Sequence, residues 1–97
     1  MKAVFISYNQ ALTDRVYDIL DDLEIRGFTK WHLTEGRGSF DGEPHYGTHA
    51  WPSMNSSILT IVEPEKVDPL LEALRAMDAE TKMQGTRAFV WGVEQGM

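Results

Sequence analysis

Cysteine is absent from this sequence of 97 residues, and basic residues are few. The missing cysteine excludes disulfides, thiolate zinc sites and cysteine nucleophiles, so any metal ligand must be His, Asp, Glu or a backbone oxygen. The net charge of −6 argues against a protein that binds the nucleic-acid backbone, because such binding needs a basic patch.

A long apolar run is also missing. The N-terminal segment has only the short run Ala3–Ile6 before polar residues follow, which is too little for a signal peptide or a membrane span. We therefore expect a cytoplasmic protein without direct membrane insertion. The length fits a single domain, 1–97. A domain of this size has a thin core, so oligomerisation is an ordinary way to bury more surface.

The hydrophobic pattern predicts four strands and two helices in the order βαββαβ. The strands are expected at about 2–8, 28–34, 57–63 and 87–93, and the helices at about 11–25 and 66–79. Gly27 is expected to end the first helix as its C-cap. The order predicts an α+β, ferredoxin-like sandwich with an antiparallel sheet. Its two most apolar strands, the first and third, belong at the centre, and the more polar second strand suits an edge.

One face of this sheet has no helix to cover it. Two helices cover the other face, so Tyr8, Trp31 and Trp91 are expected on the open face, where they need a partner. Association through the sheet face is the resulting hypothesis.

The segment from Glu35 to Asn55 has no periodicity and holds four Gly, two Pro, two His and three aromatic residues. Structureless loops of this length are uncommon in compact domains and usually carry function. We expect the function of the protein to reside in this loop, 35–55.

The start of the loop has the composition of an anion site. Gly36 and Gly38 allow backbone N–H groups to approach a ligand, and Arg37 between them can pair with phosphate or carboxylate. The simpler interpretation is a strand exit that needs glycine for its backbone angles.

The middle of the loop offers metal ligands. His45 and His49 lie four residues apart, with Glu43 just upstream, and imidazole with carboxylate suits Zn²⁺, Ni²⁺ or Cu²⁺. Exposed histidines, or histidines that contact a ligand or a partner, are the alternatives. Tyr46 and Trp51 are candidate partner-contact residues, although aromatics beside a sheet more often belong to a core or an interface.

An enzyme is not expected. The sequence lacks a nucleophile elbow, a P-loop, a dinucleotide-binding glycine motif and a His-Glu-x-x-His helix. A small enzyme that uses an intersubunit cleft, and a plain scaffold whose loop contacts a partner, remain alternatives.

Several motifs together resemble a known family. They are the βαββαβ order, Gly-Phe-Thr-Lys at 27–30, Gly-Arg-Gly at 36–38, ILTIVEPEKVDPLLEAL from the third strand into the second helix, and the loop string with His45, Gly-Thr-His at 47–49 and Trp-Pro at 51–52. The chain resembles the PII signalling proteins over nearly its whole length. It is most similar to divergent bacterial homologues, several of which accompany heavy-metal or cation efflux transporters.

The resemblance implies a homotrimer that binds a nucleotide in the clefts between subunits. It also implies a T-loop, here 35–55, that reports occupancy to a transporter, an enzyme or a regulator. By position, Gly36, Arg37 and Gly38 fall at the T-loop base near the phosphates. Gly85 and Arg87 fall where the B-loop of the family approaches the nucleotide.

The sequence departs from the family at two places. The segment 83–87, MQGTR, stands where the family has a Gly-Asp-Gly-Lys core, and the basic C-terminal run of the family is missing from 94–97. Arg37 and Arg87 alone are little charge to neutralise a triphosphate, so the ligand stays open between a small molecule and a divalent cation. The preferred interpretation is a PII-like trimeric sensor that regulates a partner, such as a transporter, through its T-loop. The alternative is a His-based divalent-metal-binding module linked to metal homeostasis.

Overall fold

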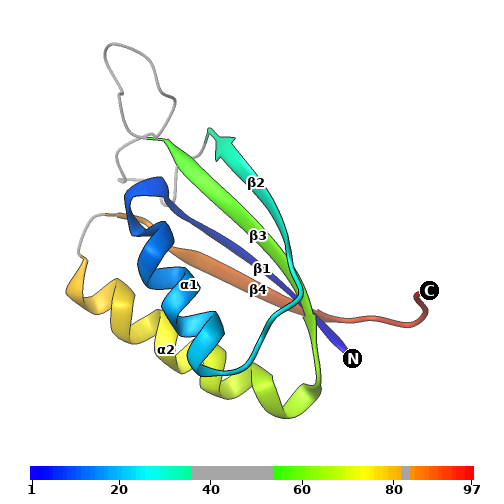
Figure 1. Cartoon of the computed structure of the whole chain (residues 1–97). Helices are drawn as coiled ribbons and strands as arrows, with labels where there is room; N and C mark the ends of the chain where they lie inside the picture. The colour runs from blue at the N-terminus through cyan, green and yellow to red at the C-terminus, as the bar shows by residue number, and fades with distance from the viewer. Residues whose placement is uncertain (36–53, 82–83) are drawn as a thin grey trace.

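The computed structural model of the chain describes residues 1–35, 54–81 and 84–97. In chain order, the elements are β1 (Lys2–Asn9), the 3₁₀ turn η1 (Gln10–Leu12), α1 (Thr13–Asp22), β2 (Thr29–Thr34), β3 (Asn55–Val62), the 3₁₀ turn η2 (Pro64–Lys66), α2 (Val67–Glu80) and β4 (Arg87–Gly92). The strands form one sheet in the order β2-β3-β1-β4, and both helices pack on the same face of it (Figure 1). The predicted α+β, ferredoxin-like βαββαβ fold is confirmed.

All strand pairs are antiparallel. The prediction that the first and third strands are central and that the second is an edge strand is confirmed. The register places Val4 opposite Thr60 and Phe5 opposite Leu59. Since successive side chains of a strand point to opposite faces, even-numbered residues of β1 meet the helices and odd-numbered residues lie on the open face.

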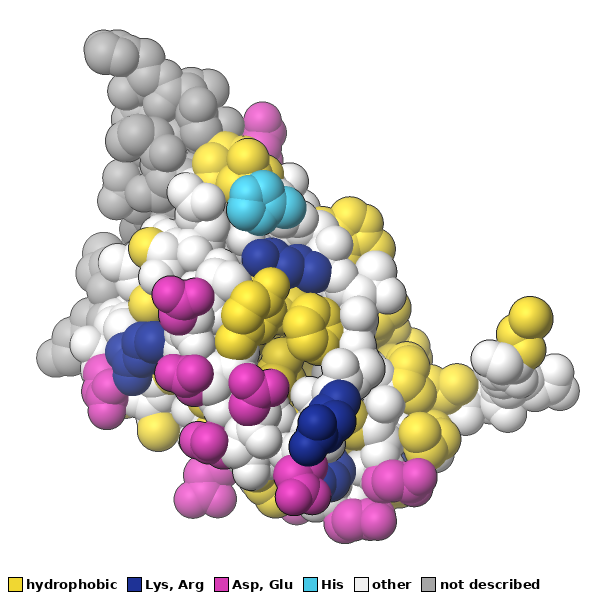
Figure 2. All heavy atoms as spheres, in the orientation of Figure 1, with side chains coloured by type: hydrophobic (Ala, Val, Ile, Leu, Met, Phe, Trp, Pro, Cys, Tyr) yellow, Lys and Arg dark blue, Asp and Glu magenta, His cyan; other side chains and the backbone are white. Residues whose placement is uncertain are grey.

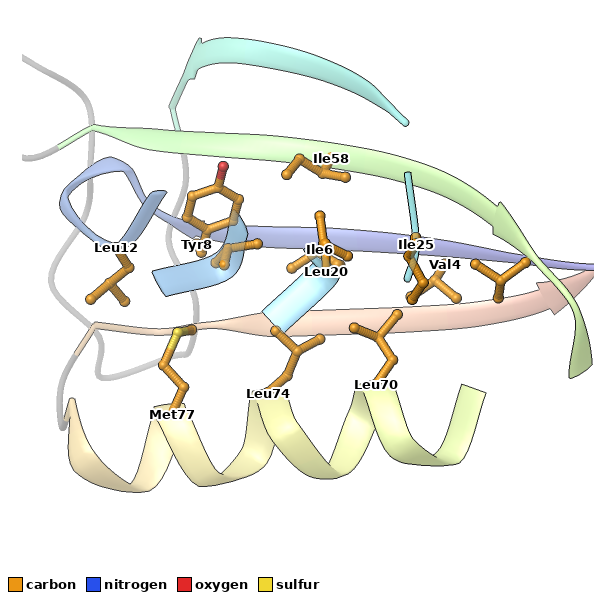
Figure 3. Packing of buried hydrophobic residues seen from close by; sticks show 12 residues of the cluster. Val4, Ile6, Tyr8, Leu12, Leu20, Ile25, Ile58, Leu70, Leu74 and Met77 are labelled. Atoms are coloured by element: carbon orange, nitrogen blue, oxygen red, sulfur yellow. The ribbon is translucent and has the colours of Figure 1, made fainter. Parts of the chain in front are cut away.

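The core lies between the sheet and the helices. From α2, Leu70, Leu74 and Met77 point at the sheet at helical spacing, where they meet β1 side chains such as Ile6 (Figure 3). Full burial of side chains of this size stabilises a fold by about 1.5–3 kcal/mol each. This single apolar layer therefore fixes the helices on one side of the sheet.

Tyr8 corrects one expectation. We expected it on the open face with the two tryptophans, but it is fully buried in the helical face of β1. Strand alternation explains the difference, because Tyr8 shares the parity of Val4 and Ile6. It belongs to the same core cluster as Leu12 and points into the layer between sheet and helices (Figure 3).

The first helix begins later than predicted. The Asn9 side chain caps the turn η1 by accepting a hydrogen bond of 2.9 Å from the Ala11 N–H. The chain then continues into α1 at Thr13. A polar residue at the end of a strand thus starts the helical segment, as expected for an Asn cap.

The same helix ends earlier than predicted, at Asp22, and Gly27 is not its C-cap. Glu24 adopts a positive φ of 57°. Around it, the Ile25 N–H donates to the Leu20 carbonyl at 2.8 Å, and the Glu24 N–H donates to the Asp21 carbonyl at 3.0 Å. This pattern is a Schellman motif, which usually places glycine at the left-handed position. The glycine lies three residues too late, so Glu24 takes the left-handed conformation itself.

Replacing Glu24 with Gly should stabilise the protein. The left-handed conformation strains a residue that has a Cβ, and glycine removes that strain, so we expect a gain of about 0.5–1 kcal/mol in the free energy of unfolding. Urea unfolding at one fixed protein concentration measures the change. Gly27→Ala is the matched control, because a Cβ at Gly27 would meet nothing within 4 Å. A loss of stability in Glu24→Gly would contradict the assignment of the cap.

Candidate functional site

Four strand ends meet at one end of the sheet, which we call the loop end. There β1 finishes at Asn9 and β2 at Thr34, while β3 begins at Asn55 and β4 at Arg87. The register brings them side by side, with Asn55 opposite both Asn9 and Thr34. The segments for which sequence analysis predicted ligand binding therefore leave and re-enter the sheet at the same end (Figure 1).

Polar side chains are buried at the loop end. Asn9 and Asn55 are only 7% and 3% exposed. The Asn9 amide donates to the Gln84 side-chain oxygen at 2.6 Å, which joins the end of β1 to the segment before β4. The Asn55 amide lies 3.4 Å from the Ser7 hydroxyl. Because buried polar groups are costly unless paired, these bonds hold the strand ends in fixed positions.

A β-bulge shapes the exit of β2. Trp31 pairs with Ser57 and Thr34 pairs with Asn55, so β2 uses one residue more than β3 over this stretch. The Ser56 hydroxyl donates to the His32 carbonyl inside the bulge. Bulges bend a strand and often occur next to functional sites. Here the bulge returns Thr34 to the same face as Trp31 just before residue 36.

Two of the predicted ligand-binding residues lie within the described part of the chain. Gly85 has a positive φ of 70°, a conformation that favours glycine, and it leads into β4. Arg87 is exposed at the start of β4, and its Nη1 donates to the Thr86 carbonyl at 2.8 Å. Both residues lie at the loop end, where β4 begins, and their ligand-binding role stays a prediction.

The other predicted site residues lie outside the described residues. They are Gly36, Arg37 and Gly38 of the predicted ligand site, Glu43, His45 and His49 of the predicted metal site, and the predicted contact residues Tyr46 and Trp51.

Large apolar side chains cover the open face of the sheet away from the loop end. Phe89, Trp91 and Trp31 are 60%, 49% and 47% exposed, and the register places all three on the face opposite the helices. The rings of Phe5 and Trp31 pack with their centroids 6.4 Å apart. The expectation that both tryptophans lie on this face is confirmed. Apolar side chains gathered on one face are typical of an interaction surface.

The helical face has a different character. Asp and Glu side chains gather over α1 and α2 on this side of the molecule (Figure 2). Within residues 1–35, 54–81 and 84–97, no group of three or more His, Asp or Glu side chains is arranged to hold a metal ion.

Among the lysines that the structure describes, Lys30 is the one whose environment shifts its pKa. Its Nζ donates to the Tyr17 hydroxyl at 3.0 Å, and this hydrogen bond raises the pKa of Lys30 above its ordinary value. A raised pKa keeps the amine protonated at neutral pH, whereas a nucleophilic or basic lysine needs a lowered one. The hydrogen bond from Lys30 thus ties β2 to α1.

Sequence reasoning missed the buried polar residues of the loop end. The sequence does indicate such residues, because both central strands change from apolar to polar at the loop end. There β1 ends with Ser-Tyr-Asn and β3 begins with Asn-Ser-Ser. The burial of Thr86 was also not predicted, although the residue lies in the segment 83–87 that stands where the family has its B-loop. It is 6% exposed, and its hydroxyl has no hydrogen-bond partner among the described residues.

Comparisons with known proteins agree with this geometry. A family model described as nitrogen regulatory protein P-II matches residues 1–96. No match is found among curated proteins. In the part of the chain that the structure describes, no helix is long and apolar enough to cross a membrane.

Solved structures of PII-like proteins share the fold. CPII, a nitrogen regulatory PII-like protein from Thiomonas intermedia bound to ADP, AMP and bicarbonate, is 23% identical with a TM-score of 0.74, and the match covers 93% of this chain and 82% of CPII. The apo form of CPII gives 22% identity and a TM-score of 0.72, over 93% of this chain and 85% of the other. A PII-like signalling protein from Thermus thermophilus is 24% identical with a TM-score of 0.67, over 93% of this chain and 83% of the other.

Proposed function

This chain belongs to the nitrogen regulatory protein P-II family, and we propose that it is a trimeric, non-enzymatic regulatory protein of the cytoplasm. In this proposal residues 1–97 act as one domain. Its loop between β2 and β3 changes state when a small ligand binds and so regulates a partner protein, such as a transporter. A ligand can shift such a switch only by binding its two states differently.

The open sheet face is the observation that carries the proposal. Phe89 and Trp91 expose about half or more of their surface there, on the edge strand β4. Burial of apolar area contributes about 25 cal/mol per Å², so three copies that pack these faces together gain substantial stability.

The loop end supports a ligand of low charge. The loop end includes Gly85 and Arg87 at the start of β4. The end of β2 is followed in the sequence by Gly36, Arg37 and Gly38. Two arginines match a ligand with one or two negative charges better than a triphosphate on a chain of net charge −6. The neighbour CPII is bound to ADP, AMP and bicarbonate, and these ligands are the first to test on this chain.

A metal-binding module is the second candidate function. It rests on the ligand chemistry of His45, His49 and Glu43, which suits a divalent cation in a chain without cysteine. The residues Tyr46 and Trp51 of the same segment suit contact with a partner protein under either function.

Phe89→Asp should convert the trimer into a monomer. A charge in the middle of a buried apolar interface is costly, while a side chain 60% exposed in the single chain is not needed for its fold. Analytical ultracentrifugation at micromolar concentration measures the change. Phe28→Asp is the control, since Phe28 is an exposed aromatic that packs on Tyr17 of α1, 5.7 Å between ring centroids. A wild-type monomer, or a trimer that survives Phe89→Asp, would contradict the proposed assembly.

Arg87→Ala should weaken nucleotide binding. Loss of one charge-assisted hydrogen bond to phosphate costs about tenfold in affinity. Calorimetric titration with ADP, AMP and ATP, with and without bicarbonate, measures the affinities, and we expect ATP not to bind more tightly than ADP. Arg15→Ala is the charge-matched control, because Arg15 pairs with Glu80 on the helical side. If none of these ligands binds or raises the melting temperature, the proposed ligand class is wrong.

The metal candidate has its own test. Titration with Zn²⁺, Ni²⁺ and Cu²⁺ should show binding that falls by at least about tenfold in His45→Ala and in His49→Ala, because each removes one imidazole ligand. His32→Ala is the control, since His32 lies exposed on β2. Equal affinity in all three variants would refute the site.

A further inference from the structure

Residues 84–87 lead into β4, and we call them the ligand segment because they include Gly85 and Arg87 of the proposed ligand site. Gly85 has no side chain to anchor it, and it adopts a positive φ of 70°. Glycine also loses more conformational freedom on ordering than any other residue. The position of the ligand segment therefore depends on contacts made by the neighbours of Gly85.

The residues on either side of Gly85 are anchored. Thr86 is 6% exposed and is thus packed into the protein just before β4. The Gln84 side-chain oxygen accepts a hydrogen bond of 2.6 Å from the Asn9 amide, and the Gln84 N–H donates to the Thr81 carbonyl at 3.3 Å. Asn9 and Gln84 are 75 positions apart in the chain, so their bond fixes the ligand segment against the end of β1.

Asn9 is itself held in place. It is 7% exposed, its side-chain oxygen accepts from the Ala11 N–H at 2.9 Å, and it lies opposite Asn55 in the register of β1 and β3. The next residue, Gln10, donates its N–H to the Met54 carbonyl at 2.9 Å. One buried amide thus joins the ligand segment to the part of the sheet at which β3 begins.

We infer that Asn9, through Gln84, is a positioning residue for the proposed ligand site. The bond holds the backbone that carries Gly85 and Arg87. The Arg87 guanidinium follows this backbone, because its Nη1 donates to the Thr86 carbonyl at 2.8 Å. A segment that is already held in place costs less to order when a ligand binds, so the bond raises the affinity without touching the ligand.

This inference rests on the proposed function and concerns how its ligand site is held. Two variants break the bond from either side. Asn9→Ser keeps a side chain that can accept from the Ala11 N–H, because serine caps a helical turn about as well as asparagine, but it loses the amide that donates to Gln84. Gln84→Met keeps the length of the side chain and removes the accepting oxygen. Each should weaken ADP binding to the full chain about three- to tenfold in calorimetric titration, the usual effect of one lost hydrogen bond.

Two double-mutant cycles identify the route of the effect. Asn9→Ser combined with Gln84→Met should weaken ADP no further than either change alone, because all three variants lose the same bond. In an Arg87→Ala background, Gln84→Met should have a smaller effect than in the wild type, because a positioning residue acts through the group that it positions. Full additivity in both cycles would show unrelated effects and would overturn the inference.

Thr13→Val is the matched control. The Thr13 hydroxyl donates to the Gln10 carbonyl at 2.7 Å, a bond at the same junction of β1 and α1 that does not involve the ligand segment. Its loss should lower the melting temperature and leave the ADP affinity unchanged. If Thr13→Val weakens ADP as much as Gln84→Met does, the effect follows general stability and the positioning role is wrong.

The outcomes separate this inference from the proposed function. Wild-type ADP affinity in both Asn9→Ser and Gln84→Met would overturn the positioning role and leave the proposed ligand site intact. A wild-type protein that binds neither ADP nor AMP, with or without bicarbonate, would overturn both.

Discussion

Two helices cover only one face of a four-stranded sheet, and much of this structure follows from that constraint. The helical face buries residues such as Ile6, Ile58 and Leu70, while Phe89 and Trp91 on the other face stay about half exposed. A chain of 97 residues has little additional apolar material for a second layer. Copies of the same chain supply that layer in the proposed trimer, so folding and assembly become linked and stability depends on protein concentration.

The loop end of the sheet has the opposite chemistry. Asn9 and Asn55 are buried amides, and the bond from Asn9 to Gln84 ties the end of β1 to the segment that leads into β4. Because a buried amide is costly unless it is bonded, these contacts give the strand ends a fixed geometry. The proposed function needs such a base, since a loop can report occupancy only if the groups at its root hold their positions.

Strand β4 presents different residues to the two faces of the sheet. Successive residues of a strand point to opposite faces, so Thr86 lies on the helical side and Arg87 on the open side. The guanidinium of Arg87 nevertheless donates a hydrogen bond to the Thr86 carbonyl.

The sequence by itself determined the order of elements, the central and edge strands, and the presence of a long segment between β2 and β3. Periodicity and turn residues are local properties, and they suffice for such conclusions. The sequence also determined the candidate ligand and metal residues by type. The tertiary structure decided which face each strand residue occupies, as the burial of Tyr8 shows. It also decided where α1 ends, because Glu24 adopts the left-handed conformation that was expected of Gly27. It alone brought Asn9 to Gln84, since contacts between residues far apart in the chain depend on strand register and helix packing, which no local pattern encodes.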